Sequence, residues 1–222
     1  MVLETAGKRA GKQTIKSAGK VAVGTKKKEG PGTRERIVSA AADLFYIEGY
    51  QAASLDSVAR RAGVNRGSLY YFFKSKKNLG LAVIDHFERQ IHQNFLQPVL
   101  QNERAGRGQL KRLADLYSEM PRAESPCCGC PIGKLSLELS GVDEDLRLSL
   151  KNVWGGVISV IETMVCQARE EGALPSSADT EGLARSFFAQ IQGAHIIARS
   201  TLDAEALGRD CRRALEGLPW VN

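Results

Sequence analysis

Helical spacing of apolar residues is the feature that most restricts how this 222-residue chain can fold. From Thr33 onward, large side chains recur at the i, i+3, i+4 and i+7 positions that share one face of a helix. The same spacing runs through a long segment over 143–171 and another over 179–200. No segment shows the alternation of apolar and polar residues that is typical of a half-buried strand. The pattern therefore predicts an all-α fold.

Start and stop signals divide the first part of the chain into four helices. A first helix is predicted from Thr33 to Gly49, and its apolar face holds Ile37, Ala40, Ala41, Leu44 and Phe45. A second begins after Ser54, and a third runs from Arg66 with Leu69 and either Phe72 or Phe73 facing the core. A fourth begins after Ser75 and is expected to end near Pro98, because proline interrupts a helix interior.

The second and third predicted helices are short, and Gly63-Val64-Asn65 joins them. Two short helices with a glycine-containing turn between them are typical of a helix-turn-helix. In that motif the second helix enters the major groove of DNA, with its first residues at the base edges.

The remainder of the chain predicts further helices and no membrane-spanning segment. They cover about 108–120 (stopped by Pro121), 131–140, 143–171, 179–200 and 204–217. No run of 18 apolar residues is present, and the first residues lack the apolar core of a secretory signal. A cytoplasmic location is the resulting expectation.

Charge is distributed unevenly along the chain. Residues 1–30 hold eight Lys and Arg against two acidic residues, residues 31–80 hold eight against four, and residues 81–222 hold fifteen against nineteen. This distribution fits a protein that offers only its first part to a polyanion. Residues 1–30 have few large apolar side chains, so a disordered basic tail is predicted. It could be a DNA-grazing arm, a solvated extension or an overlong start-site assignment.

The stretch from Thr33 to Ala82 resembles the DNA-binding domain of the TetR (tetracycline repressor) family. The shared elements are A-x-x-L-F-x-x-x-G-Y, an Ala-Gly-Val turn, G-S-L-Y-Y-F-F and K-S-K-x-x-L, in that order. The resemblance implies a three-helix helix-turn-helix domain over 31–80 and a helical ligand-binding and dimerisation bundle over 81–222. It also implies a transcriptional repressor that a small-molecule effector releases from its operator.

Four residues at the start of the predicted recognition helix are the first candidates for base contacts: Asn65, Arg66, Gly67 and Ser68. Arg66 can donate two hydrogen bonds to O6 and N7 of a guanine, which is the commonest specific contact in the major groove. Gly67 would let the backbone approach the DNA closely.

Other polar residues are candidates for contacts that set the position of the domain on DNA. The resemblance assigns Tyr70 and Lys76 to phosphates and Tyr71 to a base or sugar in the groove. Thr33 and Ser54 lie near helix starts and could add backbone contacts. The alternative for each is a solvated polar residue without a partner in the DNA.

The resemblance further implies a homodimer that reads palindromic double-stranded DNA. The segments over 143–171 and 179–200 carry more apolar surface than one small bundle readily covers. The candidates for the interface are Phe187, Phe188 and Ile191, within an intersubunit four-helix bundle. The same stripe could instead be ordinary core.

A small-molecule effector of unknown identity is expected in the C-terminal bundle, and no cofactor is implied. The candidate pocket residues are Phe87, Cys130, Trp154, Met164 and His195. His195 lies on the inner face of its predicted helix and could be a core histidine rather than a ligand contact.

The segment GCPIGKLSLELSG resembles a TetR subgroup with the pattern G-C-x-x-G-x-L-x-x-E, in which some members respond to electrophiles or oxidants through the cysteine. Here that cysteine is Cys130, at the start of a short predicted helix, where the helix dipole is expected to lower its pKa. Cys127 and Cys128 could act as resolving thiols. The alternative function is therefore a thiol-based electrophile- or redox-sensing repressor.

The other cysteines and the remaining protein classes have less support. Cys166 and Cys211 fit small core residues, and the Cys127-to-Cys130 cluster lacks the paired spacing of a zinc site. No enzyme is predicted, because no phosphate-binding glycine loop, H-E-x-x-H or nucleophile elbow is present. A DNA-binding activator or nucleoid-type protein without an effector is the third class, and it would bind DNA without ligand-induced release.

Overall fold

The computed structural model describes residues 32–119 and 129–221. Within these ranges every regular element is helical, which confirms the all-α prediction. The elements are α1 (Thr33–Ile47), α2 (Leu55–Ala62), α3 (Arg66–Phe72), α4 (Lys76–Ile91), the π-helical turn η1 (His92–Leu96), α5 (Gln97–Asn102), α6 (Gly106–Glu119), α7 (Pro131–Leu139), α8 (Glu144–Glu170), α9 (Thr180–Thr201) and α10 (Ala204–Glu216). The predicted tail, Pro121, Cys127 and Cys128 lie outside the described residues.

Side-chain caps fix the ends of the short helices α2 and α3. The Ser57 amide donates to Oγ of Ser54, and the Ser68 amide donates to Oδ1 of Asn65 at 2.7 Å. Between the two helices Gly63 adopts φ +64°, the left-handed conformation that favours glycine. The result is the predicted pair of short helices joined by a tight turn. Phe73, and not Phe72, is the residue that the small core buries.

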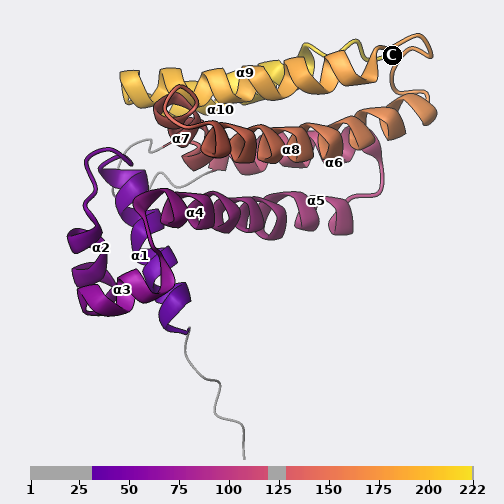
Figure 1. Ribbon diagram of the computed structural model, residues 1–222. Helices are drawn as coiled ribbons and strands as arrows, with labels where there is room; N and C mark the ends of the chain where they lie inside the picture. Colours follow the sequence, from indigo (N-terminus) through magenta and orange to yellow (C-terminus); the bar gives the residue numbers. More distant parts are fainter. Residues whose placement is uncertain (1–31, 120–128, 222) are drawn as a thin grey trace, which may run out of the picture. The chain divides into compact units, whose positions relative to one another are not determined.

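Helices α6, α8, α9 and α10 pack against one another in the second half of the chain. Figure 1 shows α4, α8 and α9 as successive layers, with α1–α3 grouped at one end of α4. Helix α4 packs on both α1 and α8, and it crosses the predicted domain boundary at residue 80. Helix α7 contacts α1, α4 and α8, so it lies where the two halves meet.

Gly106 allows α6 to begin directly against the backbone of α8. A Cβ at this position would lie 2.3 Å from the Ala168 amide nitrogen and 2.5 Å from the Met164 carbonyl oxygen. The Gly106 amide donates to Glu171 Oε2 at 3.0 Å, which satisfies one of the donors at the helix start. This position therefore requires glycine because of a close approach.

The prediction that the fourth helix ends near Pro98 is wrong. The α-helix ends at Ile91, the π-helical turn η1 follows, and Pro98 lies in the first turn of α5. The helical backbone continues from the wider π turn into α5, and Pro98 lies in the first turn after it, a position where proline is tolerated.

The prediction of Phe187, Phe188 and Ile191 as dimer-interface residues is also wrong. Their side chains are buried inside the chain's own core, with Phe187 and Ile191 fully inaccessible. Periodicity identified the buried face of α9 correctly, but α8 and α10 of the same chain cover that face.

Among the described residues, no helix is both long and apolar enough to cross a membrane.

Candidate nucleic-acid interface and effector cavity

Helix α3 presents a polar, exposed first turn. Asn65 uses its side-chain oxygen to cap the helix, and Arg66 and Gly67 are exposed beside it. Ser68 donates its amide to that cap and is half-buried. Leu69, one residue further on, is fully buried and fixes α3 to the core. The N-terminal turn is therefore free to meet another molecule while the rest of the helix is held in place.

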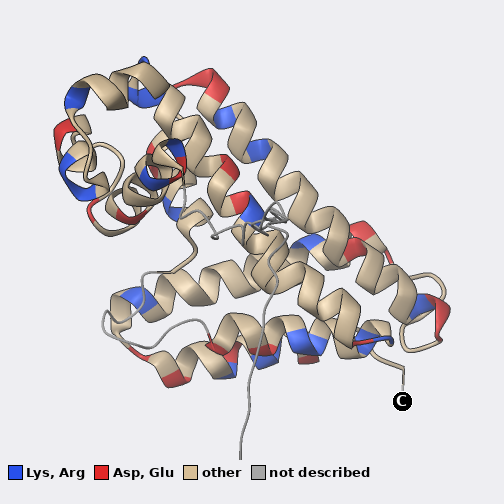
Figure 2. Cartoon of the chain, turned by 90° about the horizontal axis from the view of Figure 1, so that it is seen from below, with Lys and Arg blue, Asp and Glu red and all other residues tan. Residues whose placement is uncertain are grey.

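Arg66 is held by two neighbours on this surface. Its Nε lies 3.4 Å from Oδ1 of Asp56 on α2, and its guanidinium carbon lies 5.6 Å from the ring centroid of Tyr70. A hydrogen bond with Tyr70 and the charge of Asp56 raise the pKa of Arg66 above its usual value. Figure 2 shows that this part of the chain carries acidic as well as basic segments. The surface is thus not uniformly basic.

Tyr71 is the most exposed aromatic residue of α3, with 74 % of its surface accessible. Its ring packs edge-on against Phe72 at 5.0 Å, which orients a side chain that otherwise projects outward. Tyr70 is also exposed and lies on the side of Arg66. The two tyrosines therefore offer separate contacts, as their adjacent positions predict.

Lys76 contacts its own chain. Its Nζ donates to the Gln51 carbonyl at 3.1 Å and lies 4.7 Å from the ring centroid of Tyr50. Burial lowers the pKa of Lys76, and the nearby Glu138 acts in the opposite direction. The ammonium lies at the start of α4, but it also fixes the loop before α2. A phosphate contact by Lys76 stays a prediction.

Thr33 and Ser54 both lie at helix starts. Thr33 is the first residue of α1 and is half-buried, whereas Ser54 is exposed and caps α2. Their predicted contacts to the DNA backbone also stay predictions.

A cavity of about 430 Å³ lies among α7, α8 and α9. It brings together three of the five predicted pocket residues, Cys130, Trp154 and His195. Other lining residues were not predicted from the sequence, among them Lys134, Leu137, Gln192 and Ile196. Helical periodicity could not identify them, because Leu137 and Ile196 are exposed.

Phe87 and Met164 do not line this cavity. Met164 is fully buried in α8, where its carbonyl faces the start of α6. Phe87 is buried on α4, with its ring centroid 6.4 Å from that of Tyr46. Their apolar side chains belong to the core, so their assignment to this pocket is corrected.

His195 is buried beside the cavity, with 4 % of its surface accessible. Burial lowers its pKa to about 4, although a hydrogen bond with the Tyr117 backbone opposes this shift. Within the described part of the chain, its Nε2 and the Nε2 of Gln192 are buried without a hydrogen-bond partner. The histidine is therefore neutral at pH 7.

Cys130 is a buried N-cap residue of α7 that lines the same cavity. Burial raises the pKa of its thiol, while hydrogen bonds from the Gly133 and Ile132 backbone lower it in part. The expected lowering by the helix dipole is thus outweighed by loss of water. This corrects the predicted thiolate character.

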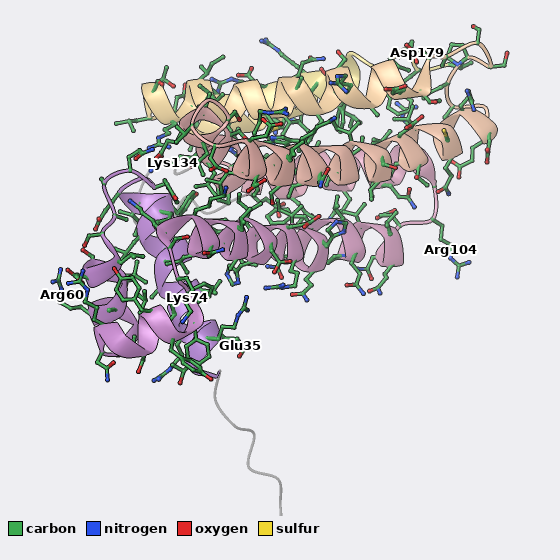
Figure 3. The ribbon with its side chains drawn as sticks, viewed as in Figure 1. Glu35, Arg60, Lys74, Arg104, Lys134 and Asp179 are labelled. Carbon is green, nitrogen blue, oxygen red and sulfur yellow. The ribbon has the colours of Figure 1, made fainter. Side chains whose placement is uncertain are left out.

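Helix α7 joins the cavity to the end of α1. Lys134 lines the cavity, and its Nζ donates to the Tyr46 carbonyl at 2.7 Å and to the Ile47 carbonyl at 3.2 Å. These are C-terminal carbonyls of α1, which have no partner within their own helix. The Tyr46 hydroxyl in turn donates to the Gly129 carbonyl at 2.7 Å. Figure 3 labels Lys134 where α7 meets α1.

Metal binding has no candidate in the part of the chain that the structure describes, since no group of three suitable side chains lies together there.

A helix-turn-helix with an exposed first turn, joined to a helical bundle that contains a cavity, defines a DNA-binding transcriptional regulator. Residues 37–83 match the model of the bacterial regulatory proteins of the tetR family, and residues 106–214 match that of the tetracyclin repressor-like C-terminal domain. The chain belongs to the tetR family.

Individual relatives agree with this assignment over most of the chain. An uncharacterised HTH-type transcriptional regulator of Lactococcus lactis is 31% identical over 178 residues, covering 79% of this chain and 87% of that protein. The HTH-type transcriptional repressor NemR of Escherichia coli is 24% identical over 175 residues, covering 79% and 88%.

Two solved structures are similar in fold. The reduced form of E. coli NemR has a TM-score of 0.73 and 25% identity, covering 86% of this chain and all of that one. A regulatory protein TetR from Rhodobacter sphaeroides has a TM-score of 0.76 and 23% identity, covering 85% and 99%.

Proposed function

We propose that this protein is a dimeric repressor that binds a palindromic operator and releases it when a small molecule occupies the α7–α8–α9 cavity. The α3 surface would read base edges through Arg66, with Tyr71 beside it in the groove. Lys76 and the residues at helix starts would contact phosphates. Each chain of the dimer would read one half-site.

The observation that carries the effector-release part is the position of α7. One helix both lines the cavity, through Cys130, Gly133 and Lys134, and binds the end of α1 through Lys134. A molecule that moves α7 must therefore stretch or break those hydrogen bonds. Because α1 packs on α2, such a shift changes the support of the helix-turn-helix.

The cavity favours a small, mostly apolar effector. Trp154, Leu137 and Ile196 supply apolar surface, and His195 is neutral at pH 7. The positive charge of the lining comes from Lys134 and Arg199. The Nε2 atoms of Gln192 and His195 could become a donor and an acceptor to a polar group of the ligand if the side chains shift.

Selection of bound duplexes from a random DNA pool tests the DNA-binding part of this proposal. We expect a palindromic sequence, and Arg66→Ala should relax the preference at one base pair in each half-site. Lys76→Ala should weaken all duplexes alike, because a phosphate contact carries no sequence information. Compounds that release the selected operator would then identify the effector. A random set of selected sequences, or equal effects of both substitutions on operator and scrambled DNA, would contradict the proposal.

A thiol-sensing repressor is the second candidate, supported by the place of Cys130 in the cavity wall and by the similarity to NemR, a repressor crystallised in a reduced form. The raised pKa of the thiol opposes this candidate, since the thiolate is the reactive species. Operator release by N-ethylmaleimide that disappears in Cys130→Ser would support it. Unaltered release in that variant would remove Cys130 from the mechanism.

A further inference from the structure

We propose that Asp56 is a positioning residue for DNA recognition, whose carboxylate directs the Arg66 guanidinium toward one base pair. This inference rests on the proposed function, because it takes α3 as the helix that reads DNA. Asp56 would not itself contact the DNA. Its effect on sequence preference would pass entirely through Arg66.

The geometry places the guanidinium between two different helices. Asp56 lies in the first turn of α2, and its Oδ1 is 3.4 Å from Nε of Arg66 on α3. Tyr70, one turn further along α3, lies on another side at 5.6 Å from the guanidinium carbon. An arginine side chain that is held at Nε and over a ring has few directions left for its two terminal nitrogens.

Both partners are exposed, so the ion pair does not hold the fold together. The accessible fractions of the Arg66 and Asp56 side chains are 67% and 52%. Exposed pairs of this kind contribute little to the free energy of unfolding. A carboxylate beside a surface that meets a polyanion also opposes binding, because phosphates repel it. Its position next to Arg66 is accounted for if it improves recognition rather than stability.

The physical advantage is a smaller loss of side-chain entropy on binding. A free arginine samples many rotamers, and fixing it at a base edge lowers its conformational entropy. A side chain that Asp56 already orients has less entropy to lose on binding. Without Asp56 the guanidinium could also turn toward a neighbouring phosphate, which would preserve affinity but not sequence preference. The carboxylate thus favours the base edge over the backbone.

A double-mutant cycle on the full chain tests this inference, with the selected operator, the operator changed at the Arg66 base pair, and a scrambled duplex as probes. In the chain that keeps Arg66, Asp56→Asn should lower the ratio of affinities for the operator and for the operator changed at that base pair about tenfold. This loss is within the range of a bidentate contact. Affinity for the scrambled duplex should stay equal or rise, because a negative charge is lost. In the Arg66→Ala background, Asp56→Asn should leave discrimination unchanged.

Asp43→Asn is the matched control, because Asp43 forms a similarly exposed pair with Arg61 at 2.9 Å on the same α1–α3 unit. It should leave discrimination at that base pair as in the wild type. Asp56→Glu, which keeps the charge, should restore part of the preference.

Two outcomes would overturn the inference while the proposed function stands. One is unaltered discrimination in Asp56→Asn, and the other is an equal loss with and without Arg66. A wild-type protein that prefers no sequence would instead overturn the proposed function itself.

Discussion

His195 shows how packing decides the chemistry of a residue that periodicity leaves open between core and ligand contact. His195 lies on the apolar face of its predicted helix, which indicated a side chain that points into the bundle. The structure places it at the cavity with 4 % of its surface accessible. The lowered pKa follows from loss of water on burial, which depends on residues far away in the sequence such as Tyr117, whose ring packs against that of His195. Sequence alone could therefore predict its burial but not its neutrality.

The pKa of His195 predicts a pH dependence of stability. Folding lowers the pKa from about 6.5 to about 4, so below pH 6.5 the unfolded chain binds a proton that the folded chain does not. The free energy of unfolding should therefore fall as the pH decreases from about 6.5 to about 4, by up to about 3 kcal/mol from this group. Urea denaturation of wild type and His195→Gln across this range measures it.

His92→Gln makes the same chemical change at the end of α4, away from the cavity. It should keep the wild-type slope, whereas the slope of His195→Gln should be shallower. Identical slopes in wild type and His195→Gln would show that His195 does not lose its proton on folding.

The exposed residues of α3 could be predicted from the sequence, because a short helix with few apolar positions has only one way to pack. Leu69 and Phe73 are buried, which leaves Arg66 and Tyr71 outside. The Asp56–Arg66 pair was not predicted. The two residues lie ten positions apart on different helices, so no helical spacing connects them.

The first residues of the helices were predicted more accurately than their last residues. Ser54 and Ser75 each cap the helix that they were expected to start, because the capping hydrogen bond is local. Asn65, predicted in the turn before α3, caps that helix as well. The end near Pro98 was wrong because the chain continues through η1 into α5. A π turn depends on packing that a one-dimensional pattern does not contain.

Helix α7 gives a prediction of its own. Lys134→Met removes the ammonium that binds two carbonyls at the end of α1, a loss worth about 1–3 kcal/mol for hydrogen bonds from a charged group. Amides around 46–53 should then exchange with deuterium about tenfold faster or more, since local opening becomes easier. Hydrogen exchange of the free protein, followed by mass spectrometry, measures the change.

Lys151→Met provides the control, because Lys151 is an exposed lysine of α8 outside this junction. Exchange around 46–53 should stay at the wild-type rate in that variant. Because Lys134 also lines the cavity, a compound that releases the wild-type operator is compared at concentrations that saturate both proteins, and there it should release less operator from Lys134→Met than from the wild type. Full release by Lys134→Met would exclude the α7–α1 hydrogen bonds as the route from the cavity to the DNA.

In the whole molecule, the surface of α9 that a second copy could contact differs from the predicted one. Phe187 and Ile191 fill the core, whereas Ile196 and Ile197 are more than half exposed. Gly193, one turn before Ile197, has open space where its side chain would be, so another helix could approach closely there. We therefore expect a dimer to bury apolar surface on the outer side of α9.

Ile197 allows this arrangement to be tested without filling the cavity, since its side chain is 56 % accessible and does not line it. Ile197→Glu should leave the helical circular dichroism spectrum unchanged but give a monomer in sedimentation equilibrium, because a buried carboxylate without a partner is costly. Operator affinity should fall about a hundredfold or more, since two linked half-site contacts become independent. Leu100→Glu, which adds the same charge at an exposed residue of α5, should stay dimeric. A dimeric Ile197→Glu protein with wild-type operator affinity would place the subunit contact elsewhere.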